Sequence, residues 1–165
     1  MKNIVLLRHA KSSWKDASLD DSDRPLNKRG KLDSRKMADR FCKRGIIIDL
    51  IISSTSKRTM DTIKIFIKSF DYKPKIIFDD SLYLADKEQI LKVLTSLDEQ
   101  YKNVMIVGHN PGITNTANLL SEFSIENIPT TGIIGFLYEG NWKDIKEKKC
   151  TFLFFDYPKK KDSII

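Results

Sequence analysis

The segment NIVLLRHA, residues 3–10, indicates the type of fold. Its apolar run over residues 3–7 predicts a β-strand covered on both faces, because a strand with one face in water alternates apolar and polar residues. Arg8 and His9 stand directly after this strand. In sheets covered on both faces, ligands bind beyond the carboxyl ends of the strands. Polar residues in this position are therefore candidates for function.

The rest of the chain repeats the pattern of a short apolar run followed by a helical pattern. Further strands are predicted over residues 46–53, 75–78, 103–107, 133–138 and 150–157. Apolar spacing predicts helices over residues 27–45, 56–70, 87–97 and 111–120. The polar residues 11–26 predict a long loop. A strand followed by a helix four times predicts an α/β fold, namely a three-layer αβα sandwich around a mostly parallel central sheet.

Length and composition are typical of one globular domain. The chain has 165 residues, of which 41% are hydrophobic, so we expect a single domain over residues 1–158 and a basic, flexible tail over residues 159–165. No apolar run approaches the ~18 residues that span a bilayer, and the short N-terminal run lacks the features of a signal peptide. We expect a cytoplasmic protein that is a monomer or a weak oligomer.

Charge and cysteine content narrow the possible partners. The net charge is +7, which weakly favours anionic partners. No basic stripe with interleaved aromatic residues occurs, so neither nucleic acid nor a membrane is an expected partner. Cys42 and Cys150 belong to no CxxC motif and lie near no histidine, which predicts free thiols rather than a zinc site. We expect no metal and no cofactor.

Polar residues follow three of the predicted strands. Arg8 and His9 follow the first strand, two serines and Arg58 follow the second, and His109 and Asn110 follow the strand over residues 103–107. Each motif alone has a plainer explanation, such as a serine that caps a helix or an arginine on a solvated face. Both histidines of the chain occupy such positions, however, so we favour catalysis over the structural role that a lone histidine more often has.

These residue types suit phosphate chemistry. Arginine binds phosphoryl oxygens in pairs, and Arg8 and Arg58 would supply two such groups. A helix that begins after Asn110 would direct free backbone N–H groups and its positive dipole end at an anion. A neutral imidazole such as that of His9 can attack phosphorus and form a covalent intermediate. A protonated His109 would stabilise the charge on the equatorial oxygens.

Several segments resemble a known family. LLRHAKSSW (6–14) is similar to the RHG-type signature of the histidine phosphatase superfamily, which also contains the phosphoglycerate mutases, with Ala10 where many members have glycine. Further segments are similar to its small SixA-like phosphohistidine phosphatase branch: DRPLNKRG (23–30), SSTSKRTMDT (53–62), LYLAD (82–86) and VGHNPGIT (107–114). The resemblance spans about residues 3–138.

The resemblance implies a phosphoglycerate mutase-like fold and a metal-independent phosphatase. His9 would be the nucleophile, and Arg8, Arg58 and His109 would complete the phosphate pocket. The chain is too short for the subdomain that larger members insert over the pocket, so we expect an open site that suits protein phosphohistidine on a phosphorelay or phosphotransfer protein. Two alternatives remain: a small-molecule phosphatase or mutase of the same superfamily that acts on a phosphorylated metabolite, or a phosphate-binding module without turnover.

The residue that protonates the leaving group is less defined. Asp79 and Asp80 follow the strand over residues 75–78, and Asp80 is a candidate general acid. Capping of the following segment is the favoured explanation for both. A phosphohistidine substrate reduces the need for an acid, because an imidazole nitrogen leaves more readily than an alkoxide.

The remaining candidates lie in the predicted loop and at the helix starts. Lys11, Ser12, Asn27 and Asn110 are candidate substrate-binding residues, although Lys11 has a solvent-facing alternative and Asn27 a helix-capping one. Arg24 is a candidate to orient a loop carboxylate. Trp14 is expected to pack the long loop over the first strand, which is commoner for an isolated aromatic residue than stacking on a substrate.

Overall fold

The computed structural model describes residues 1–161. Six strands and four α-helices alternate as predicted. The strands are β1 (Lys2–Arg8), β2 (Leu50–Ser53), β3 (Lys75–Phe78), β4 (Asn103–Gly108), β5 (Ile133–Tyr138) and β6 (Thr151–Asp156). The helices are α1 (Lys28–Cys42), α2 (Lys57–Lys68), α3 (Lys87–Thr95) and α4 (Gly112–Leu120), with short 3-10 helices at Asp21–Asp23, Asp80–Leu82 and Trp142–Asp144.

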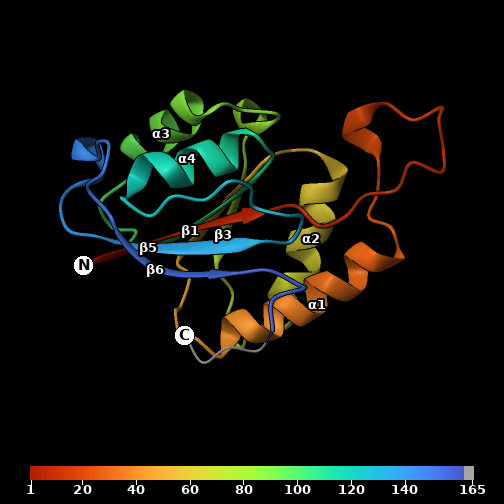
Figure 1. Cartoon of the computed structure of the whole chain (residues 1–165), viewed down its shortest axis with the longest axis horizontal. Coiled ribbons are helices and arrows are strands. Elements are labelled where there is room, and N and C mark those ends of the chain that lie inside the picture. Colours follow the sequence, from red (N-terminus) through yellow and green to blue (C-terminus); the bar gives the residue numbers. More distant parts are fainter. Residues whose placement is uncertain (162–165) are drawn as a thin grey trace.

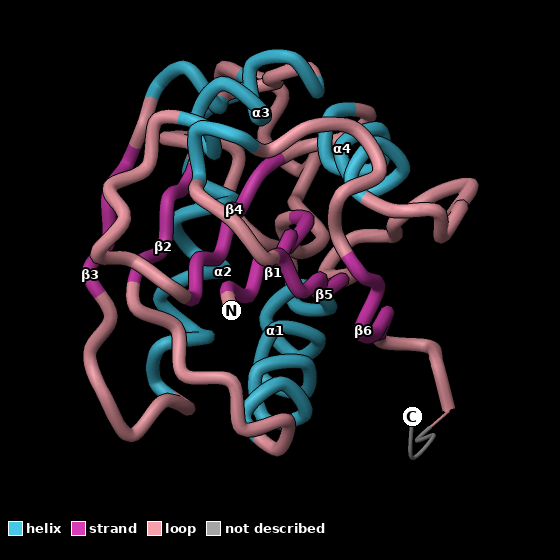
Figure 2. The backbone as a smooth tube through the Cα atoms, turned by 90° about the vertical axis from the view of Figure 1, so that its left-hand side faces the viewer, coloured by secondary structure: helices cyan, strands magenta, loops and turns pink. Residues whose placement is uncertain are grey.

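The strands form one sheet in the order β3-β2-β4-β1-β5-β6. The pairs β3-β2, β2-β4 and β4-β1 are parallel, and β5 runs antiparallel to both of its neighbours. Helices α3 and α4 cover one face of the sheet and α1 and α2 cover the other (Figure 1; Figure 2 shows the sheet from its side). The predicted three-layer αβα sandwich with a mostly parallel sheet is confirmed.

Alternating side chains of the central strands fill two separate cores. Ile4 and Leu6 of β1 pack with residues of α3 and α4, whereas Val5 and Leu7 pack with residues of α1 and α2. All four are fully buried. This is the physical meaning of the uninterrupted apolar run, since successive side chains of a strand point to opposite faces and both faces here are covered by helices.

The helices begin where side chains cap them. Asn27, Ser56 and Asp86 accept hydrogen bonds from the backbone N–H groups of Gly30, Thr59 and Gln89, respectively. Each cap satisfies a donor that has no partner within the helix. The caps set where α1, α2 and α3 start, and thereby where the polar residues at those starts lie.

One predicted strand is shorter than expected. Residues 46–53 form a strand only from Leu50 onward, where pairing with Val104 begins. Just before it, the Asp49 carboxylate accepts hydrogen bonds of 2.8 Å from the backbone N–H groups of Lys102 and Asn103. The apolar run therefore extends past the sheet, and Ile47 is half exposed.

The loop that follows β1 projects beyond the carboxyl end of the sheet (red-orange in Figure 1). A bridge between Ser12 and Leu26 closes its base, and the 3-10 helix Asp21–Asp23 lies within it. At the other end of the chain, the side chain of Lys160 donates to the carbonyl of Phe155. Residues 162–165 of the predicted tail lie outside the described residues. Within residues 1–161, no helix is both long enough and apolar enough to cross a bilayer.

Candidate active site

The strand register brings the two histidines together. Arg8 of β1 lies opposite Gly108 of the parallel strand β4, so the residues that follow, His9 and His109, emerge at the same edge of the sheet. The centroids of their rings are 5.3 Å apart. Strand β2 flanks β4 on its other side, and α2, which follows β2, carries Arg58. Thus Arg8, His9, Arg58 and His109 converge as predicted, although the first and the last of them are 101 residues apart in sequence.

His9 is held in one tautomer. Its Nδ1 lies 2.7 Å from the carbonyl oxygen of Ala10. Because a carbonyl can only accept, Nδ1 carries the proton and Nε2 keeps its lone pair. Burial lowers the pKa of His9 to about 4; the hydrogen bond to Ala10 opposes this shift and the positive charge of Arg58 adds to it. The imidazole is therefore neutral at neutral pH, with a nucleophilic nitrogen available.

His109 is also neutral but is bonded through both nitrogens. Nη2 of Arg58 lies 3.4 Å from Nδ1, and Oγ of Ser54 lies 2.8 Å from Nε2. Since the guanidinium can only donate, Nδ1 accepts and Nε2–H donates to Ser54. Burial, then His9 and Arg58, lower the pKa of His109 to about 3. The ring of Tyr83 meets it edge-on, with centroids 5.4 Å apart.

Arg58 is buried and Arg8 is half-buried, and both have N–H donors without a partner. Arg8 donates from Nη1 to the carbonyl of Ile128, and Arg58 donates to the backbone carbonyl and the carboxylate of Asp21. Among the side chains of residues 1–161, the only buried polar atoms without a hydrogen-bond partner are Nε of Arg8, Nε of Arg58 and Oγ1 of Thr131. Native proteins rarely leave such groups unsatisfied, and two guanidinium donors in one place suit an anion.

Thr131 belongs to the turn that supports His9. Its backbone N–H is shared between the carbonyls of Arg8 and His9, and its φ is 61°. A β-branched residue in the left-handed region is strained, and such strain is characteristic of functional sites. Nothing in the sequence marks Thr131, because a strained backbone angle has no signature in residue type here.

Three of the N–H groups at the start of α4 are not free for an anion, contrary to the prediction. The backbone N–H groups of Ile113, Thr114 and Asn115 already donate to the oxygens of His109, Asn110 and Pro111. The side chain of Asn110 is the cap, since its Oδ1 also accepts from the Thr114 hydroxyl while its Nδ2 donates to Ile128. Asn110 therefore supports the start of α4 and does not line the pocket.

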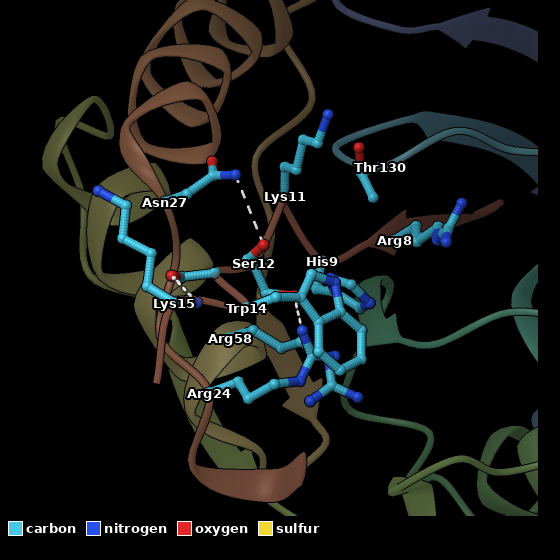
Figure 3. A pocket seen from close by; sticks show the side chains of 11 residues that line it. Arg8, His9, Lys11, Ser12, Trp14, Lys15, Arg24, Asn27, Arg58 and Thr130 are labelled. Carbon is cyan, nitrogen blue, oxygen red and sulfur yellow. Dashed lines mark hydrogen bonds between the residues drawn. The ribbon is translucent and has the colours of Figure 1, made fainter. Parts of the chain in front are cut away.

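Arg8, His9 and Arg58 line a pocket of about 420 Å³ at the end of β1 (Figure 3), whereas His109 contacts this group from outside the lining residues. Its walls include six predicted site residues, Arg8, His9, Lys11, Ser12, Asn27 and Arg58, together with Ser13, Trp14, Lys15, Arg24 and Thr130. Asn27 serves both predicted purposes, because it caps α1 and also lines the pocket. Within residues 1–161, no three acidic, cysteine or histidine side chains are grouped as a metal site.

The predicted acids are not among the lining residues. Asp80 is exposed in the 3-10 helix Asp80–Leu82, and Asp79 caps that helix by accepting from the N–H of Ser81. The carboxylate next to the pocket is Asp21, which accepts from Arg24, Arg58 and the hydroxyl of Tyr83. The bond from Tyr83, followed by those from the arginines, lowers the pKa of Asp21 to about 2.

Asp21 and Tyr83 were missed by the sequence analysis. Asp21 is one of several aspartates in a polar loop, and Tyr83 stands 62 residues further on. The one useful signal was Arg24, whose predicted partner, a loop carboxylate, is Asp21 at 3.1 Å. The expected packing of Trp14 on the first strand is wrong: Trp14 is 76% exposed and lies over the guanidinium of Arg24.

The histidine phosphatase superfamily (branch 1) is the family whose model matches residues 4–83 of this chain. An uncharacterized chloroplastic protein of Arabidopsis thaliana is 32% identical over 152 residues, which cover 87% of this chain and 70% of that protein. Uncharacterized mycobacterial proteins, among them one of Mycobacterium leprae, are 24% identical over 93% of this chain and their full length.

Solved structures repeat the fold. A proposed phosphohistidine phosphatase SixA from Agrobacterium tumefaciens is 27% identical with a TM-score of 0.81, covering 95% of this chain and 98% of that one. The protein histidine phosphatase SixA complexed with tungstate has the same TM-score at 20% identity, covering 94% and 97%. A phosphoserine phosphatase from Entamoeba histolytica has a TM-score of 0.68 at 15% identity, covering 94% and 97%.

This αβα sandwich brings two histidines, the buried Arg58 and the half-buried Arg8 to the carboxyl edge of its sheet, an arrangement that suits phosphoryl transfer. The chain belongs to the histidine phosphatase superfamily, and among solved structures it is similar to the SixA phosphohistidine phosphatases.

Proposed function

We propose that this protein hydrolyses protein phosphohistidine through a covalent phospho-His9 intermediate. The observation that carries the proposal is the tautomer of His9: Nδ1 is committed to the carbonyl of Ala10, so the lone pair of Nε2 is available at the pocket. Nε2 attacks phosphorus as the phosphorus–nitrogen bond of the substrate breaks, and the substrate imidazole leaves with a proton. Water then attacks phospho-His9 and releases inorganic phosphate.

The surrounding charges support phosphoryl transfer. Arg8 and Arg58 bind the phosphoryl oxygens, partly through the Nε donors that have no other partner. A dianionic phosphoryl group raises the pKa of the adjacent His109, so that His109 takes up a proton and donates to an equatorial oxygen. This neutralisation comes from side chains of the chain itself, so we propose a reaction that needs no metal ion, in the cytoplasm.

The state of the nearby carboxylates favours a phosphoramidate substrate. Asp21 is ionised at neutral pH, because its pKa is lowered to about 2, and therefore has no proton to donate. Asp80 is exposed and does not line the pocket. An alkoxide leaving group needs a general acid, whereas the imidazole of phosphohistidine leaves with the help of water. The exposed side chains of Lys11, Trp14 and Lys15 at the pocket also leave room for a protein-borne phosphoryl group.

The proposal is tested by trapping the phosphoenzyme. Incubation with a radiolabelled phosphohistidine protein, followed by rapid denaturation, is expected to label the chain with a phosphoryl group that is labile to acid and stable to base. His9→Ala should abolish the label, whereas Asp80→Asn, a substitution outside the pocket, should retain it. A label that persists in His9→Ala would overturn the mechanism.

A substrate panel tests the specificity separately. Phosphohistidine protein is expected to be hydrolysed with a much higher kcat/KM than sugar phosphates or phosphoglycerate. Comparable turnover of these small esters would replace the proposed substrate with a metabolite. A requirement for a bisphosphate primer would instead identify a mutase.

A further inference from the structure

Trp14 is a largely exposed aromatic side chain that lines the pocket, and the backbone just before it is held by hydrogen bonds. The neighbouring Ser13 donates its backbone N–H to the carbonyl of Pro25 at 2.8 Å, and Ser12 pairs with Leu26. These bonds anchor the segment on both sides of the loop. A large apolar ring that is 76% exposed on an anchored backbone contributes little to the core. The contact of its ring with the rest of the chain is the stack on Arg24.

The guanidinium of Arg24 stacks on one face of the Trp14 indole. Each nitrogen of its guanidinium donates a hydrogen bond: Nη1 donates to Oγ of Ser12 at 2.6 Å, and Nε and Nη2 donate to Oδ1 of Asp21 at 3.2 and 3.1 Å. These bonds fix the plane of the guanidinium, whose central carbon lies 3.6 Å from the centroid of the Trp14 ring. One face of the indole is thus stacked on a buried cation, and the exposed remainder includes its second face.

Trp14 lies at the phosphate pocket with most of its side chain exposed. Trp14 lines the same cavity as His9 and Arg58 (Figure 3). A phosphoryl group that His9 attacks in line has its leaving group directed away from His9, out of the pocket. For phosphohistidine that leaving group is a planar imidazole, which must be protonated as it departs. Aromatic faces, and indole above all, attract planar rings and cations.

We propose that Trp14 is a specificity-determining residue that stacks on the imidazole ring carrying the phosphoryl group. The proposal rests on the proposed phosphohistidine phosphatase function and adds a basis for substrate choice. Stacking strengthens the binding of a substrate in which a ring is bonded directly to the phosphoryl group. An alkyl phosphate, whose leaving group is flexible and has no π face, gains nothing comparable.

The test compares two phosphoramidates that differ in the ring. Phosphohistidine has an imidazole on phosphorus, and the phosphoramidate ion has only an amino group. In Trp14→Leu, the ratio of kcat/KM for phosphohistidine to kcat/KM for phosphoramidate is expected to fall ~10-fold, mainly through a higher KM for phosphohistidine. Trp14→Phe keeps a π face and should hold the ratio within about twofold of the wild type.

Equal losses on both substrates, or an unchanged ratio in Trp14→Leu, would overturn the proposal, because a residue that acts only through Arg24 affects both alike. Binding supplies a readout without turnover. In a His9→Ala background, Trp14→Leu should weaken phosphohistidine relative to inorganic phosphate by ~10-fold in calorimetric titrations. A wild-type protein that hydrolyses neither substrate would overturn the proposed function, and the titrations would still decide the role of Trp14.

Discussion

At the scale of single residues, the carboxylate of Asp21 binds two arginines of the pocket, Arg24 and Arg58. It accepts from Arg24, Arg58 and Tyr83, although its own side chain is 43% exposed. Charge-assisted hydrogen bonds of this kind set the direction of a guanidinium more than they add stability at an exposed site. Asp21 therefore positions Arg58 for the phosphoryl group.

We expect Asp21→Asn to lower kcat/KM by ~10-fold, because a neutral amide cannot hold both arginines as the carboxylate does. Steady-state kinetics on phosphohistidine measures the effect. Asp23→Asn is the matched control, since Asp23 is exposed in the same 3-10 helix. Faster turnover in Asp21→Asn would show instead that Asp21 competes with phosphate for Arg58.

Both histidines of the site have pKa values below that of a free imidazole. The pKa of His9 is lowered to about 4 and that of His109 to about 3, against 6.5 for a free imidazole. As pH falls, His9 stays neutral until pH reaches about 4, where protonation removes the nucleophile. A proton NMR titration of the ring protons should show no histidine midpoint near 6.5. A midpoint there for either histidine would contradict the proposed electrostatics.

At the scale of elements, the start of α1 is pressed against the segment that follows His9. A Cβ added at Gly30 would lie 2.2 Å from the carbonyl oxygen of Lys11, which accepts the backbone N–H of Asn27 at 3.0 Å. Helix propensity favours alanine over glycine by about 1 kcal/mol, whereas a clash with backbone costs ~1–3 kcal/mol or more. At position 30 the close contact with Lys11 therefore favours glycine, although helix propensity favours alanine.

Gly30→Ala is expected to lower the free energy of unfolding by ~1–3 kcal/mol and to reduce activity, because α1 must move away from the segment that follows the nucleophile. Urea denaturation measures the stability. Lys31→Ala, at the exposed next position of α1, should change stability by no more than about 0.5 kcal/mol. A stabilised Gly30→Ala variant would mean that helix propensity outweighs the contact.

At the scale of the whole molecule, a buried ion pair ties the last strand to the first helix. Asp156, at the end of β6, is 3% exposed and contacts Arg40 of α1, with Arg44 at 3.9 Å. Its carboxylate also accepts the N–H of Tyr157 at 2.9 Å. These contacts join positions 116 residues apart in sequence and fasten the edge strand β6 to the layer beneath the sheet.

Asp156→Asn is expected to lower the free energy of unfolding by about 3 kcal/mol, because it removes the counter-charge from two partly buried arginines. Urea denaturation of the variant measures this loss. The control is Asp144→Asn, which changes an exposed aspartate in the 3-10 helix Trp142–Asp144. A loss below about 0.5 kcal/mol would show that solvent already screens the pair.

The layers of this protein and the edge at which its site lies follow from the amino-acid sequence alone. Uninterrupted apolar runs such as residues 3–7 specify strands covered on both faces, and the carboxyl ends of parallel strands meet at one edge. Arg8, His9, Arg58 and His109 could therefore be brought together from the sequence, because each stands at the end of a strand, just after one, or in the first turn of the helix that follows one. Both rules depend on local periodicity, which the sequence carries directly.

The contacts around those four residues, in contrast, depend on how the chain packs in three dimensions. The contacts of Asp21 with Tyr83 and of Trp14 with Arg24 are made by a loop, which has no period from which a partner can be inferred. Asn110 likewise became a helix cap because Thr114 and Ile128 lie within its reach. The tautomer of His9 was settled by a backbone carbonyl 2.7 Å away. Such contacts depend on chain geometry in three dimensions, which residue types in sequence order do not contain.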